Sequence, residues 1–133
     1  MKTKQTATAL DEFTRAYIEC ALWSSTDEDS KSLDASYSVA DLAPETLDSM
    51  VKDCRDFQES FAELLALAYE KYTHSPDWIH EEQAGHDFWL TRNRHGAGFW
   101  DRGLGDVGQV LTDMAHPYGE VNLYVGDDGR IYA

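Results

Sequence analysis

Glycine is confined to one end of this chain, and its distribution limits where long helices can form. All nine glycines lie at or after Gly85. Glycine weakens a helix because it loses more backbone freedom on folding than any other residue. We therefore expect a helical, acidic part at 1–84 and a glycine-rich α+β part at 85–133, which together form one domain across residues 1–133.

Apolar spacing predicts two helices before the glycine-rich part. The first is expected over 9–23, and a polar, acidic connection over 24–38 follows it. The second is expected to begin at Pro44, because the fixed backbone angle of proline suits the first helical position. Apolar residues then recur at three- and four-residue steps to about Tyr72, which predicts a single unbroken helix. These residues are Leu47, Met50, Val51, Cys54, Phe57, Phe61, Leu64, Leu65, Ala68 and Tyr72.

Glycine and proline guide the prediction for the rest of the chain. The segment "SPDWIHEEQAG" predicts a short helix that begins at Ser75 and ends at Gly85. The segments "HDFWLTRN" and "GFWD" are expected to be short strands joined across "RHGAG", where Gly96 and Gly98 allow a tight turn. A helix in "DVGQVLTDMAHPYG" and a hairpin in "EVNLYVGDDGRIYA" follow. The inward residues of that helix are expected to be Val107, Val110, Leu111 and Met114.

These elements predict an α+β fold. N-terminal helices, one of them long, acidic and amphipathic, are expected to pack against a small antiparallel β-sheet formed by two C-terminal hairpins. The two cysteines, Cys20 and Cys54, fall on apolar helix faces, so we expect buried thiols rather than a disulfide.

Two segments of the glycine-rich part, "GHDFWLTRNRHGAGFWDRGLGD" and "YGEVNLYVGDDGRIY", carry a resemblance to known proteins. They resemble small accessory proteins of unassigned function from bacteriophages and other mobile elements. The resemblance covers roughly the last third of the chain and implies no role for any single residue. It implies a context, since accessory proteins of such elements often counter host nucleases or modify host transcription.

The net charge restricts the class of partner. The chain has 25 acidic and 11 basic residues and a formal charge of -14, whereas solubility alone needs a magnitude of about 2 to 8 in a small domain. Such a charge repels nucleic acid and attracts basic protein surfaces. We therefore expect a host nucleic-acid-binding protein or nucleoprotein complex with a basic groove as the partner, and no direct binding of nucleic acid.

Carboxylates on the predicted second helix recur at steps of three, four or seven residues, opposite the apolar stripe. They are expected to form one solvent-facing row spaced about 5 Å apart along the helix axis, which is similar to phosphate spacing on a nucleic-acid strand. Two arginines of the predicted strand complete the candidate site. The candidate partner-binding residues are Asp27, Glu28, Asp29, Glu45, Asp48, Asp56, Glu59, Glu63, Glu70, Arg92 and Arg94.

The leading hypothesis is an inhibitor encoded by a phage or mobile element that blocks a host defence nucleoprotein or nuclease by acidic nucleic-acid mimicry. Anti-CRISPR and anti-restriction proteins are inhibitors of this type. One alternative is a small enzyme in which His95 is a general base, Asp101 orients it, and nearby arginines hold an anionic substrate. Another is an interaction adaptor that uses exposed aromatic residues as anchors, among them Trp78, Trp89 and Trp100.

No cofactor or metal is expected. The segment "HEEQAGH" lacks the zinc-protease spacing of two histidines four residues apart, and "GAGFWDRGLGDVG" matches no phosphate-binding loop. No stretch has the roughly 20 apolar residues of a membrane span, and no signal peptide is evident. We expect no membrane association and a location in the cytoplasm of a bacterial host cell.

Overall fold

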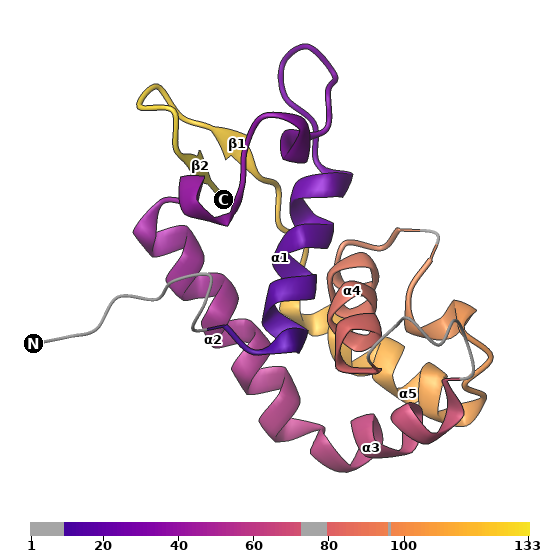
Figure 1. Cartoon of the computed structure of the whole chain (residues 1–133). Helices are drawn as coiled ribbons and strands as arrows, with labels where there is room; N and C mark the ends of the chain where they lie inside the picture. The colour runs from indigo at the N-terminus through magenta and orange to yellow at the C-terminus, as the bar shows by residue number, and fades with distance from the viewer. Residues whose placement is uncertain (1–9, 73–79, 96) are drawn as a thin grey trace, which may run out of the picture.

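The computed structural model describes residues 10–72, 80–95 and 97–133, and within these the chain is mostly helical (Figure 1). The described part contains five α-helices and a single two-stranded antiparallel sheet. The helices are α1 (Glu12–Ser24), α2 (Pro44–Ser60), α3 (Ala62–Lys71), α4 (His80–Arg92) and α5 (Asp106–Ala115). The strands are β1 (Tyr124–Val125) and β2 (Ile131–Tyr132). Short 3₁₀ helices lie at Leu33–Ala35, Val39–Asp41, Phe99–Asp101 and His116–Tyr118.

The most extensive contact between helices joins α1 and α4, which lie side by side and parallel. Phe13 near the start of α1 faces Gly85, and Ser24 at the end of α1 accepts a hydrogen bond from Trp89 (2.8 Å). A Cβ atom on Gly85 would lie 2.0 Å from the carbonyl oxygen of Phe13. Gly85 therefore permits a close approach inside a helix, and the expectation that it ends a helix is wrong. Ser75, the expected start of that helix, lies outside the described residues.

Aromatic rings fill the core between α1, α2 and α4. The ring centroids of Phe57 and Phe88 lie 4.2 Å apart, and Phe57 also stacks on Phe99 at 5.9 Å. Tyr17 and Phe13 pack on Phe88 at 5.3 and 6.0 Å. Such pairs contribute about 0.5–1.5 kcal/mol each beyond the burial of their area. Because the rings come from elements at both ends of the chain, the core links the helical and glycine-rich parts.

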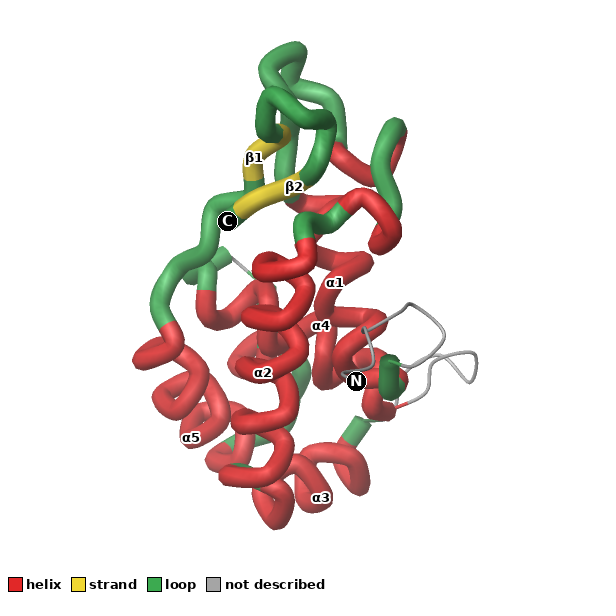
Figure 2. The backbone as a smooth tube through the Cα atoms, turned by 90° about the vertical axis from the view of Figure 1, so that its left-hand side faces the viewer, coloured by secondary structure: helices red, strands yellow, loops and turns green. Residues whose placement is uncertain are grey.

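The predicted second helix is two helices, which corrects the expectation of an unbroken segment. Helix α2 ends at Ser60, and Phe61 has non-helical backbone angles (φ −124°, ψ 32°) before α3 begins. Figures 1 and 2 show α3 set at an angle to α2. Leu65 and Ala68 of α3 are buried in the core.

The first predicted hairpin is absent from the described residues. "HDFWLTRN" belongs to α4 and its end, and "GFWD" contains the 3₁₀ helix Phe99–Asp101. Consecutive aromatic residues in α4 suggested a strand, but they are buried because protein surrounds this helix on most sides. Gly98 does adopt the expected positive φ (139°), while Gly96 lies outside the described residues.

The later elements agree with expectation more closely. Helix α5 buries Leu111 and partly buries Val107 and Met114, although Val110 is 39% exposed rather than inward. The C-terminal hairpin pairs Tyr124 with Tyr132 and Val125 with Ile131. The hairpin is anchored through β2, where the Ile131 side chain is buried in the core and the Ile131 carbonyl accepts a hydrogen bond from the Ala43 N–H (2.9 Å).

Two further expectations concern the cysteines and the membrane. Cys20 and Cys54 are buried, free thiols, as predicted. Among the described residues, no helix combines the length and apolar character that crossing a bilayer requires.

Replacing Gly85 by alanine tests the α1–α4 contact. Alanine at an ordinary helical position would stabilise the fold by about 1 kcal/mol. Here we expect the free energy of unfolding to fall by about 3 kcal/mol, because the new methyl group overlaps the Phe13 backbone. Urea denaturation measures the change. Ser49→Ala on the exposed face of α2 serves as control and should stay within about 0.5 kcal/mol; a stabilised Gly85→Ala protein would contradict the close approach.

Candidate partner-binding surface

The acidic residues predicted to bind a partner lie on three elements: the loop after α1, helix α2 and helix α3. All are exposed except Asp27, which is half-buried. None forms an ion pair with another described residue. They are Asp27, Glu28, Asp29, Glu45, Asp48, Asp56, Glu59, Glu63 and Glu70.

The predicted row of carboxylates is divided at Phe61. Four of its members project from α2 and two from α3, and the two helices run in different directions. The expectation of one straight row is therefore wrong. The α2 members are Glu45, Asp48, Asp56 and Glu59, and the α3 members are Glu63 and Glu70.

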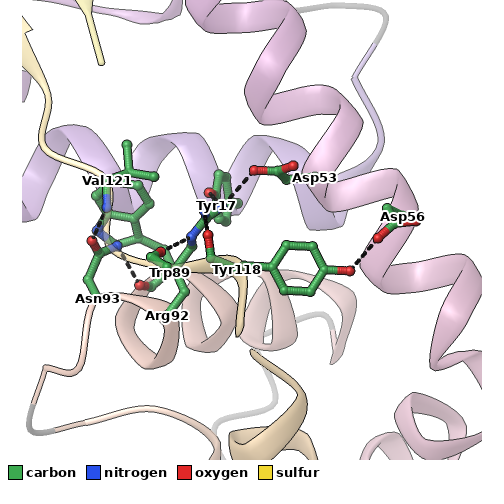
Figure 3. Close-up of polar contacts among 9 residues, drawn as sticks. Tyr17, Asp53, Asp56, Trp89, Arg92, Asn93, Tyr118 and Val121 are labelled. Atoms are coloured by element: carbon green, nitrogen blue, oxygen red, sulfur yellow. Dashed lines mark hydrogen bonds and ion pairs between the residues drawn. The ribbon is translucent and has the colours of Figure 1, made fainter. Parts of the chain in front are cut away.

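Helix α2 is held firmly against the core. Met50, Cys54 and Phe57 are buried on its inner face. On its flank, the Tyr118 hydroxyl donates a hydrogen bond to Asp56 (2.5 Å), which occupies one oxygen of that carboxylate (Figure 3). The exposed acids of α2 are thus carried on a fixed element.

Arg92 lies in the interior, where it joins four segments of the chain (Figure 3). Its guanidinium forms an ion pair with Asp53 (2.8 Å) and donates to the Tyr17 hydroxyl (2.9 Å). It also donates to the carbonyl oxygens of Tyr118 (2.5 Å) and Gly119 (2.8 Å). The predicted role of Arg92 in contacting a partner does not fit this burial. Arg92 belongs to a helix instead of a strand, and it fixes α1, α2 and the segment after α5 to α4.

Arg94 lies just beyond α4 and, unlike Arg92, is at the protein surface. It has a positive φ of 59° and an exposed side chain. The prediction that both arginines belong to a strand is therefore wrong, since Arg92 ends α4 and Arg94 follows it. Arg94 remains a candidate contact residue.

Charge reversal at the two arginines separates a structural from a surface role. We expect Arg92→Glu to lower the free energy of unfolding by at least about 2 kcal/mol, because it removes buried hydrogen bonds and places a second carboxylate beside Asp53. Arg94→Glu makes the same charge change at an exposed position and should stay within about 0.5 kcal/mol. Thermal denaturation compares them, and equal melting temperatures would contradict the assigned role of Arg92.

The residues of the predicted catalytic group are not assembled. His95 is exposed and lines a hollow with Ser24, Asn93 and Glu120, whereas Asp101 does not line it. No hydrogen bond joins His95 to Asp101. Three arginines lie near His95 in the sequence. Arg92 and Arg102 form ion pairs with Asp53 and Asp87, and Arg94 is exposed.

Arg102 pairs with Asp87, a buried carboxylate that the sequence did not single out. Asp87 accepts hydrogen bonds from Arg102 (2.9 Å), Tyr72 (2.9 Å) and Gln83 (3.1 Å). Burial raises the pKa of Asp87 despite the opposing effect of Arg102. Burial also raises the pKa of the nearby Cys20 thiol, to about 12. The hydrogen bonds to Asp87 join α4 to Tyr72 and Arg102.

The tryptophans named for the adaptor hypothesis have different environments. Trp89 is buried and donates its indole N–H to Ser24. Trp100 is 54% exposed, and Trp78 lies outside the described residues. Trp23, which the sequence did not suggest as an anchor, is 56% exposed.

The acidic loop after α1 faces the C-terminal hairpin across a second hollow. Asp27 orders the loop, because its carboxylate accepts the backbone N–H groups of Asp29 (2.8 Å) and Lys31 (3.0 Å). Tyr124 and Asp127 of the hairpin line the opposite side. Sequence reasoning missed these two residues because the pairing of the segments is long-range.

Comparison with known proteins assigns the chain to no family. No protein-family model matches the chain, and comparison with curated proteins and with solved structures found no match either. Within residues 10–72, 80–95 and 97–133, no group of three or more histidine, cysteine, aspartate or glutamate side chains could hold a metal ion.

Proposed function

We propose that the protein is a non-enzymatic inhibitor, encoded by a phage or mobile element, that acts in the cytoplasm of a bacterial host. Its target is a host defence nucleoprotein or nuclease of the kind blocked by anti-CRISPR and anti-restriction proteins. The protein occupies the basic groove of this target with carboxylates that substitute for nucleic-acid phosphates. It binds no nucleic acid directly.

The observation that carries the proposal is the set of exposed carboxylates without ion pairs among the described residues. With a formal charge of -14, these groups repel one another and lower the stability of the free protein. A basic groove relieves that repulsion and gains favourable contacts. The same field accelerates encounter with the target at low salt.

The geometry of α2 supports mimicry. Neighbouring carboxylates three residues apart, such as Glu45 and Asp48 or Asp56 and Glu59, are separated by about 5 Å along the axis. This is the same order as the phosphate spacing on one strand, about 3.4 Å along the helix axis. Because α2 is fixed to the core by Phe57 and by the Asp53–Arg92 pair, little ordering is needed when the target binds.

Affinity capture from a bacterial lysate tests the proposal. The tagged protein, after nuclease treatment of the lysate, should retain a nucleic-acid-binding protein at low salt and lose it as salt rises, because ions screen the attraction. Mass spectrometry identifies what is retained. The test variant replaces four carboxylates of α2 and α3 by amides: Glu45→Gln, Asp48→Asn, Glu59→Gln and Glu63→Gln.

The matched control removes four exposed carboxylates from other elements: Glu19→Gln, Glu81→Gln, Asp101→Asn and Asp113→Asn. We expect the α2–α3 variant to lose most of the captured protein and the control to keep most of it. Capture of only proteins that do not bind nucleic acid, or equal losses from both variants, would contradict acidic mimicry by these helices.

A further inference from the structure

Two hollows lie next to one another on the protein. One, of about 550 Å³, lies between the loop after α1 and the C-terminal hairpin, and the other, of about 350 Å³, lies at the ends of α1 and α4. Thr26 lines both, and residues 120–123 of one lining are followed in sequence by residues 124–127 of the other. We call the two adjacent hollows together, with linings that include 24–29 and 120–127, the hairpin groove.

The lining of the hairpin groove has a single sign of charge. It contains five carboxylates and neither lysine nor arginine. The side chain of Asp27 is engaged with the loop backbone, while Glu28 and Asp29 are exposed. The five are Asp27, Glu28, Asp29, Glu120 and Asp127.

Charge alone does not define a binding site, since most acidic side chains on a protein surface are simply solvated. Two tyrosines, Tyr37 and Tyr124, also line the groove. Tyr124 is 56% exposed, and its ring is held by stacking on Tyr132 at 5.9 Å. An ammonium or guanidinium group is attracted both by a carboxylate and by the face of a tyrosine ring. An anionic or neutral ligand lacks at least one of these two attractions.

The helix ends strengthen the preference for a cation. Because α1 and α4 are parallel, both end at this groove, where Ser24, Trp89 and Asn93 contribute to the lining. The C-terminus of a helix carries a partial negative charge, and two such ends here reinforce the carboxylates.

We infer that the hairpin groove binds an extended segment of a protein partner that carries lysine or arginine side chains. The two hollows, of about 550 and 350 Å³, offer space for more than one side chain of a bound segment. The inference rests on the proposed function in one respect, the basic nature of the partner. It assigns a second contact, separate from α2 and α3, that binds individual lysine or arginine side chains of the partner.

Fluorescence anisotropy tests the inference with a fluorescein-labelled peptide in which lysine and serine alternate. Alternation directs every lysine of an extended chain to one side. The same peptide with acetylated lysines lacks the charge and should not bind. The test variants are Glu28→Gln with Asp29→Asn, and Tyr124→Ala. Tyr124→Phe keeps the ring, and Glu81→Gln with Asp113→Asn makes the same charge change at exposed positions outside both proposed binding surfaces.

We expect the two test variants to weaken binding of the lysine peptide at least about threefold, and both control variants to bind within about twofold of the unaltered protein. Circular dichroism verifies that each variant is folded. Three results would overturn the inference. They are equal weakening by the two double variants, no effect of Tyr124→Ala, and no binding of the lysine peptide. None of these results bears on capture of a host protein by α2 and α3, so failure here is distinguishable from failure of the proposed function.

Discussion

The close approach of α1 to α4 at Phe13 and Gly85 determines the placement of most other elements. With no Cβ atom between them, the two backbones lie near enough for Tyr17, Phe88 and Trp89 to interlock along the shared length. Phe57 of α2 packs on the ring of Phe88 in this aromatic core. Arg92, near the end of α4, uses the same alignment to reach Tyr17 and Asp53. A wider separation of the two helices would leave this guanidinium without its partners.

The interior and the surface have opposite electrostatic character. The buried Arg92 is paired with Asp53, and the half-buried Arg102 is paired with the buried Asp87. Outside, acidic groups are left in excess and remain in water, where they cost little individually. This division places the carboxylates that we propose to bind a partner on the exposed surface, while the Arg92–Asp53 pair fixes helix α2, which carries four of them.

Sequence periodicity predicted α1, α5, the start of α2 and the last hairpin, because each has one buried face or a turn with its own local signal. It failed where burial is not one-sided. Helix α4 is enclosed on most sides, so its aromatic residues show no helical period. The break at Phe61 has no glycine or proline to mark it in the sequence. For the candidate site, exposure of the acids followed from amphipathicity, but Tyr124 and Asp127 could not be placed beside Asp27 without knowing how distant segments meet.

The parallel pairing of α1 and α4 also affects how the chain can fold during synthesis. Helices α2 and α3 lie between them in sequence, so α1 emerges from the ribosome well before the helix that covers its apolar face exists. Contacts between residues distant in sequence slow folding, and apolar surface that stays exposed in the meantime promotes association with other chains. The abundant carboxylates of the early part counter that hazard, since nascent chains of high like charge repel one another. We therefore expect the acidity of residues around α1 and α2 to help keep the unfinished chain soluble until α4 is made.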